Sequence, residues 1–258
     1  MFDVGLPTAG LLVAIAFVSG IGITTIGPGG VFVTIALYSF TSISAGEVAG
    51  TAHATFIATG VVGTLTYVHS GEMSSEESRI VAVILSATSV VGALCGAYVN
   101  SHVSRSGFGF LLGGAMIAVG GTILYREWGE FNSPYAVDVT TQTGRTVVGV
   151  LGFVLGGCSG LLGVGGPVLA VPALVLFGVP MLLAVAVAQM QSIFIATFAT
   201  AGYVLQGNVS WPLATIVGVP LIAGTVVGWK VAHLVNPARL KAGLGVTLVA
   251  IGPYLALS

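Results

Sequence analysis

The sequence predicts an all-α, polytopic membrane helical bundle, and three observations support this prediction. First, 55% of the 258 residues are hydrophobic and only 6% are charged, whereas a soluble domain carries about 25% charged residues. Second, the mean hydropathy is +1.06. Third, the apolar runs are continuous and approach the roughly 20 residues of a membrane-spanning helix, without the polar alternation of outer-membrane strands.

Ten apolar segments account for most of the chain. They cover residues 7–26, 29–43, 46–68, 80–100, 107–125, 146–163, 165–180, 182–205, 211–234 and 238–257. Short polar stretches separate them. The first residues include Asp3 and no basic residue, so we expect the first apolar segment to be kept as a span and not cleaved as a signal peptide.

The chain resembles itself at an offset of 136 residues. At this offset the matches include Gly27 with Gly163, Gly29 with Gly165, Gly30 with Gly166, Tyr67 with Tyr203, Asn100 with Asn236 and Arg105 with Lys241. Composition explains scattered glycine matches, but not a tyrosine, an asparagine and a basic residue in one register. We therefore predict two homologous transmembrane repeats, 1–125 and 146–258, joined by a polar linker loop over 126–145.

The relative direction of the repeats depends on the number of crossings. If each glycine-broken pair of segments forms one crossing unit, the chain crosses eight times and the halves are parallel. If all ten segments cross, the halves are inverted. Basic residues mark the cytoplasmic side, and they flank corresponding turns in the two halves: Arg105 in the first, and Lys230, Arg239 and Lys241 in the second. This pattern slightly favours parallel halves with both termini outside.

A glycine-rich break interrupts an apolar stretch in each half, with GPGG at 27–30 and GVGGP at 163–167. Irregular backbone at membrane depth persists only where it is buried in protein or lines a cavity, and paired breaks indicate a transporter site. Each break exposes the N-terminus of a half-helix, near Val31 and Val168, which favours an anion. The alternative is that these glycines only allow close helix packing.

Polar side chains also occur inside the apolar segments. His53 and Gln189 match at the same offset, and we expect both to face the bundle interior as donors to an anion, with His53 also able to relay a proton. An interhelical hydrogen bond is the alternative for His53. Thr55 and Gln191 form a second matched pair on another face. The predicted substrate-binding residues are Gly27, Gly29, Gly30, His53, Thr55, Gly163, Gly165, Gly166, Gln189, Gln191 and Ser192.

Several function classes have no support in the sequence. It contains no catalytic or nucleotide-binding motif, so we predict no enzyme, no catalytic or metal-binding residue and no cofactor. A net charge of −1 gives no reason to expect a nucleic-acid partner. Cys95 and Cys158 are predicted to be buried packing residues. The expected partners are a small anionic substrate and the lipid bilayer, and a homo-oligomer is left open.

The sequence resembles the sulfite exporter TauE/SafE family of membrane transporters over nearly its whole length. The resemblance rests on the duplicated halves and on a motif of the form G-x-G-G-G-x-x-x-x-P. The second half matches it at Gly163, Gly165, Gly166 and Pro172, with Pro167 in place of the third glycine of the run. The first half matches at Gly27, Gly29 and Gly30, with Val31 and Ala36 at the remaining two positions.

This resemblance implies a multi-pass permease of the cell membrane for sulfite, sulfonates or related organosulfur anions. The prediction is therefore a secondary transporter that binds a small anion between paired glycine-rich half-helix N-termini. One alternative is a non-transporting membrane assembly or sensor protein, in which the glycines only pack helices. The other is a proton or ion channel, whose flux would not saturate at low substrate concentration.

Overall fold

The computed structural model describes residues 5–69, 75–128, 139–232 and 237–257. In this part of the chain every regular element is a helix. The elements are α1 (Leu6–Thr25), the 3₁₀ turn η1 (Pro28–Gly30), α2 (Val31–Phe40), α3 (Ala45–His69), α4 (Glu76–Asn100), α5 (Arg105–Trp128), α6 (Gln142–Leu162), α7 (Gly166–Leu176), α8 (Met181–Leu205), α9 (Trp211–Ala232) and α10 (Pro237–Leu257).

The helices follow the apolar segments of the sequence, which confirms the predicted fold class. Seven of them (α1, α3, α4, α5, α6, α8 and α9) are long and apolar enough to cross a membrane. By contrast, α2 and α7 have only 10 and 11 residues. The middle of the predicted 126–145 loop lies outside the described residues, but α5 continues to Trp128 and α6 begins at Gln142.

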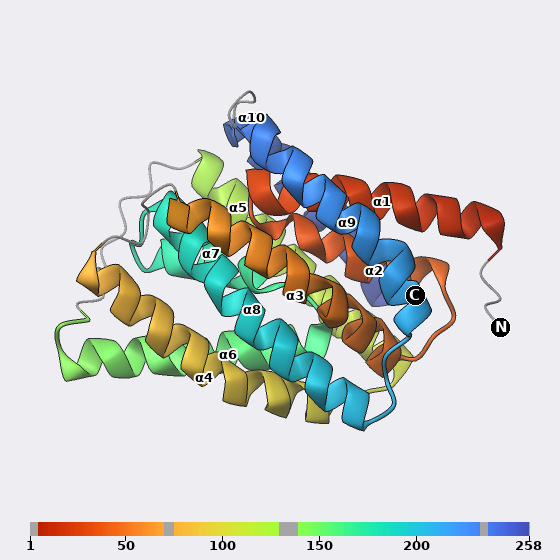
Figure 1. Ribbon diagram of the computed structural model, residues 1–258, viewed down its shortest axis with the longest axis horizontal. Helices are drawn as coiled ribbons and strands as arrows, with labels where there is room; N and C mark the ends of the chain where they lie inside the picture. Colours follow the sequence, from red (N-terminus) through yellow and green to blue (C-terminus); the bar gives the residue numbers. More distant parts are fainter. Residues whose placement is uncertain (1–4, 70–74, 129–138, 233–236, 258) are drawn as a thin grey trace.

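The two glycine-rich breaks make hairpins. Gly27 has a φ of 92° and Gly163 a φ of 65°, left-handed conformations that glycine adopts without steric cost. In the first hairpin the backbones of Gly22 and Gly29 touch, since a Cβ on Gly29 would lie 2.4 Å from the Gly22 carbonyl carbon. Each half-helix, α2 or α7, therefore runs back toward the end of the bundle from which α1 or α6 came (Figure 1).

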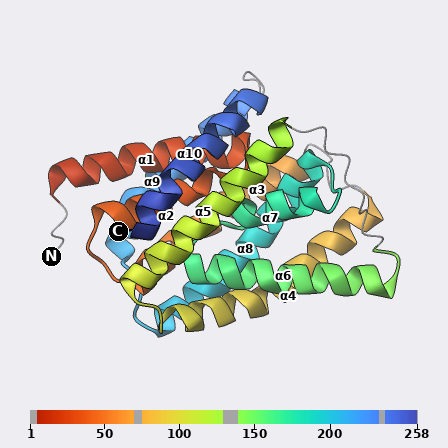
Figure 2. The same cartoon turned by 180° about the vertical axis from the view of Figure 1, so that it is seen from behind.

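Helices at equivalent positions of the two halves run in opposite directions. The central pair, α3 and α8, is antiparallel: Gly50 packs on Tyr203, and Gly63 packs on Gln189. The pair α5 and α10 is antiparallel as well, with Gly113 against Gly252 at one level and Gly120 against Gly245 at another (Figure 2). The two halves are thus inverted relative to each other, although their descent from a duplication stays a prediction.

The preference for parallel halves was therefore wrong, for two physical reasons. A broken pair such as α1 and α2 is a hairpin that returns toward its starting end, so it is not one crossing unit (Figure 1). In addition, the position of Arg105 does not indicate which side of the membrane it faces, because its charge is used within the protein. Its guanidinium donates to the carbonyl oxygens of Ile43, Tyr38 and Thr41, the last at 2.7 Å, and so it caps the C-terminal end of α2.

The basic residues gather at one end of the bundle once the halves are inverted. We call this end, where α4 and α6 begin, the basic end (Figure 1). Six of the seven Lys and Arg residues belong to helix turns there: Arg79, Arg126, Arg145, Lys230, Arg239 and Lys241. The positive-inside rule predicts that this end faces the cytoplasm. The start of α1 and the end of α10 would then lie on the outer side.

Small residues bring the outer helices together. A Cβ on Gly156 of α6 would lie 2.4 Å from the Ser89 carbonyl oxygen of α4, and a Cβ on Gly224 of α9 would lie 2.0 Å from the Phe17 carbonyl oxygen of α1. Close backbone approach of this kind is typical of helix pairs in membranes. The prediction for the cysteines was wrong, because Cys95 and Cys158 are both exposed on the outward faces of α4 and α6.

Candidate functional site

A small cavity lies between the two hairpin turns, about halfway along α3 and α8. Its free volume is about 10 Å³, which is room for roughly one water molecule. It is lined by Ile23, Gly27, Gly30, Phe56, Thr59, Gly165, Pro167, Val168, Gln189 and Ser192. The lining thus comes from both hairpins and from both central helices.

The N-termini of both half-helices meet at this cavity. Gly30 precedes the first residue of α2, and Gly165 precedes the first residue of α7; both line the cavity. A helix N-terminus carries about half a positive charge. Because the hairpins enter from opposite ends of the bundle (Figure 1), two positive helix ends converge on one space.

The side chains that line the cavity are neutral. Gln189 is 1% exposed and Ser192 is 3% exposed. The Ser192 hydroxyl oxygen accepts a hydrogen bond from the Gly166 backbone N–H at 3.3 Å. Thr59 is the third polar side chain, and the remaining side chains of the lining are apolar. Among the residues that the structure describes, no Lys, Arg, His, Asp or Glu lines the cavity, so the helix ends are its main source of positive potential.

Two matched hydrogen bonds connect the central helices to the broken helices; we call them the carbonyl clamps. Gln189 Nε2 donates to the carbonyl oxygen of Ile23 at 3.2 Å. His53 Nε2 lies 3.0 Å from the carbonyl oxygen of Ser159. The offset of 136 residues relates both members of one clamp to those of the other. The carbonyls belong to the last turns of α1 and α6, and that of Ser159 also accepts a hydrogen bond from the Gly163 backbone N–H at 2.9 Å.

Two tyrosines repeat this arrangement at the next carbonyl along each helix. The Tyr67 hydroxyl donates to the carbonyl oxygen of Thr24 at 3.4 Å, and the Tyr203 hydroxyl donates to that of Gly160 at 2.8 Å. These tyrosines and these carbonyls are again related by the same offset. Each broken helix end is therefore held by side chains of both central helices, α3 and α8.

The structure brings five of the predicted site residues to the cavity. They are Gly27, Gly30, Gly165, Gln189 and Ser192. Three further glycines shape the hairpins without lining the cavity. Gly29 packs on Gly22, Gly166 packs on Ser192, and Gly163 supplies the positive-φ turn.

The other three predicted residues lie away from the cavity. His53 is fully buried and belongs to a clamp. The Thr55 side chain faces Gly218 of α9. Gln191 Nε2 donates to the Ser89 hydroxyl of α4 at 2.6 Å. Thr55 and Gln191 thus pack equivalent interfaces, α3 with α9 and α8 with α4.

Sequence reasoning missed some of the lining. Ile23, Phe56, Thr59 and Pro167 were not predicted as site residues. Phe56 had two available signals: it follows His53 by three residues, on the same helical face, and it matches Ser192 at the offset of 136. An apolar ring on that face was easily taken for core packing.

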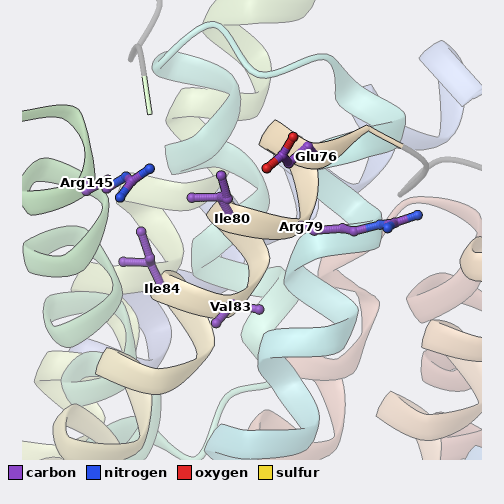
Figure 3. Close-up of a pocket in the computed structure, with 6 residues that line it drawn as sticks. All are labelled: Glu76, Arg79, Ile80, Val83, Ile84 and Arg145. Atoms are coloured by element: carbon purple, nitrogen blue, oxygen red, sulfur yellow. The ribbon is translucent and has the colours of Figure 1, made fainter. Parts of the chain in front are cut away.

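A larger hollow lies on the outer surface, between α4 and α6 at the basic end. It has a volume of about 360 Å³ and is lined by Glu76, Arg79, Ile80, Val83, Ile84 and Arg145 (Figure 3). Figure 3 shows Arg145 extending from α6 toward α4, and Arg79 pointing away from α6 on the other side of α4. This hollow is more open than the central cavity, and unlike that cavity it has charged residues in its lining. Among the described residues, no group of three or more His, Cys, Asp or Glu side chains could hold a metal ion.

Comparison with known proteins identifies related sequences. The family profile described as sulfite exporter TauE/SafE matches residues 11–255. The chain is also similar to a probable membrane transporter protein of Methanocaldococcus jannaschii, with 31% identity over 115 residues. That match covers 41% of this chain and 43% of the relative, so less than half of the relative's length is spanned. No solved structure gives a significant match.

Proposed function

Because the chain belongs to the sulfite exporter TauE/SafE family, we propose that this multi-pass membrane protein is a secondary transporter of a small sulfur oxyanion or sulfonate, acting in the cell membrane. One observation carries the proposal: two oppositely directed hairpins bring the N-termini of α2 and α7 to a single cavity. Discontinuous helices whose N-termini point at an anionic substrate group are typical of secondary transporters.

The cavity supports a binding role for Gly27, Gly30, Gly165, Gln189 and Ser192. The glycines let a ligand approach the backbone closely, and Gln189 and Ser192 offer neutral donors. Ile23, Phe56 and Val168 form the apolar part of the lining, which suits the organic group of a sulfonate. At about 10 Å³ the cavity is closed around less than one substrate molecule, so the hairpins have to separate for binding.

The charge of the site favours monoanions. Two helix N-termini contribute roughly one positive charge in total, and no charged side chain in the described part of the chain lines the cavity. A monoanion such as hydrogensulfite or a sulfonate is then approximately neutralised. A dianion such as sulfate keeps about one uncompensated charge in a buried site, which is strongly unfavourable.

Inverted halves suggest how access alternates. In transporters of this type, one repeat or bundle rocks against the other around a fixed central site. Here the cavity lies between the α1–α2 and α6–α7 hairpins, which are held by the opposite halves through the carbonyl clamps. We propose that the two halves, 1–125 and 146–258, move relative to each other and open the cavity alternately to the two sides.

The test is uptake of radiolabelled sulfite into proteoliposomes, with taurine and sulfate as competitors. The proposal predicts saturable uptake that depends on an imposed gradient and that an organic sulfonate inhibits. Uptake that stays linear with concentration would indicate a channel. The absence of uptake under any imposed pH gradient, with protein shown to be folded, would contradict transport of this substrate class.

A further inference from the structure

We propose that His53 and Gln189 are positioning residues, and that each acts as a neutral N–H donor through which one half fixes the broken helix of the other. This inference rests on the proposed function and goes beyond it. It removes His53 from the substrate-binding and proton-carrying roles expected from the sequence. It also predicts that glutamine can replace His53.

The clamps cross between the halves. His53 belongs to α3 in the first half and its acceptor, Ser159, to α6 in the second. Gln189 belongs to α8 in the second half and its acceptor, Ile23, to α1 in the first. Because each clamp joins the two halves, movement of one half against the other changes the position of a hairpin turn relative to the central helix that holds it. The clamps therefore set where the hairpin turns stand relative to the central helices.

The surroundings of His53 favour a neutral donor. Nε2 faces a carbonyl oxygen, so it carries the hydrogen. Nδ1 is buried and has no hydrogen-bond partner among the residues that the structure describes. The imidazole stacks on Tyr203 at a centroid distance of 6.3 Å and meets Phe56 edge-on, also at 6.3 Å.

A second N–H on a protonated ring would have no acceptor in this environment, which is costly for a buried group. The Tyr203 hydroxyl donates to the Gly160 carbonyl oxygen and makes no hydrogen bond with Nδ1. The imidazole thus presents the same group as the Gln189 amide does in the other half, namely one N–H directed at a carbonyl oxygen.

The two clamps differ in their distance from the substrate. Gln189 and Ile23 both line the cavity, whereas His53 and Ser159 do not. Loss of the His53 clamp therefore moves a hairpin without removing a substrate contact. We expect it to lower kcat and to leave KM nearly unchanged.

The experiment compares His53→Gln, His53→Leu and the wild type in sulfite uptake, at pH values on both sides of neutrality. Thr64→Val is the control, because Thr64 lies on the same helix and its buried hydroxyl has no partner. His53→Leu loses one hydrogen bond to a buried carbonyl, and kcat is expected to fall about tenfold, which corresponds to about 1.4 kcal/mol. His53→Gln should keep the wild-type kcat, KM and pH profile.

A second readout is amide hydrogen exchange of the turn from Ser159 to Gly166, which should lose protection in His53→Leu and keep it in His53→Gln. Wild-type kcat and protection in His53→Leu would overturn the inference. So would a His53→Gln protein that behaves like His53→Leu or loses a pH dependence present in the wild type. If the wild type shows no uptake, the proposed function fails, and the exchange data alone still decide whether His53 positions the hairpin.

Discussion

The two hairpins use different residues to make the same arrangement. In the first, a positive-φ Gly27 is followed by the 3₁₀ turn Pro28–Gly30 before α2 begins. In the second, Gly163 alone makes the turn, and α7 begins at Gly166. The clamp residue is a glutamine for the first hairpin and a histidine for the second. Both hairpins reverse the chain after a positive-φ glycine, and in both an N–H donor from a central helix bonds a carbonyl oxygen in the last turn of the preceding helix.

The difference between the hairpins separates contacts that hold the hairpin together from contacts that leave space in the cavity. Equivalent glycines have unequal surroundings: Gly29 packs against the Gly22 backbone, whereas a Cβ on Gly165 would lie 3.8 Å from both Phe56 and Pro167. Gly29 therefore closes its hairpin, and Gly165 leaves space in the cavity. The same position of the motif is thus packed against backbone in the first half and lines the cavity in the second.

The largest effect is expected at this pair of glycines. Gly29→Ala would place Cβ 2.4 Å from the Gly22 carbonyl carbon, and overpacking against backbone costs about 3 kcal/mol or more. We expect little folded protein, measured as the monodisperse fraction after purification and as Tm. Gly165→Ala should fold like the wild type. If Gly29→Ala is as stable as Gly165→Ala, the distinction between the two hairpins is wrong.

Charge selectivity is the next effect. Methanesulfonate is a monoanion and sulfate is a dianion. Two half-charges from the helix ends balance only one negative charge, so we expect methanesulfonate to compete with labelled sulfite at a concentration at least about tenfold lower than sulfate, a difference of about 1.4 kcal/mol. Competition curves in proteoliposomes measure this ratio. Equal competition would mean that charge from outside the described lining neutralises the site.

A smaller effect is expected where Arg105 caps α2. The planar Arg105 guanidinium bonds three carbonyl oxygens and lies 4.7 Å from the Tyr38 ring centroid. Arg105→Lys replaces it with a single ammonium group. We expect a loss of about 1–2 kcal/mol, seen as a lower Tm. Lys230→Gln, which changes an exposed residue, serves as the control. A Tm equal to that of the control would show that the cap does not contribute.

The fold was largely predictable because each span is a continuous apolar run. Helix directions were not, since composition does not show whether a break continues a crossing or reverses it. The reversal depends on Gly27 and Gly163 adopting positive φ. The basic residue that misled the prediction, Arg105, is bound to backbone carbonyls about 60 residues away in the sequence, and no local pattern reveals such contacts.

The candidate site follows the sequence only in part, for a related reason. The paired breaks lie at the cavity, and the offset of 136 residues relates His53 to Gln189, but that these residues serve a substrate stays a prediction. However, their acceptors, Ser159 and Ile23, are 106 and 166 residues away, so polarity alone could not separate a ligand from a clamp.

The most direct test of the central claim, that substrate occupies the space between the two half-helix N-termini, is saturable sulfite uptake by Gly165→Ala beside Gly114→Ala. The added methyl group of Gly165→Ala would lie against Phe56 and Pro167, within a cavity of about 10 Å³. Gly114→Ala adds the same group on α5, with no atom within 4 Å. We predict that Gly165→Ala folds but loses uptake or shows a strongly raised KM, while Gly114→Ala transports like the wild type. Normal KM and kcat in a folded Gly165→Ala protein would contradict a substrate site at this cavity.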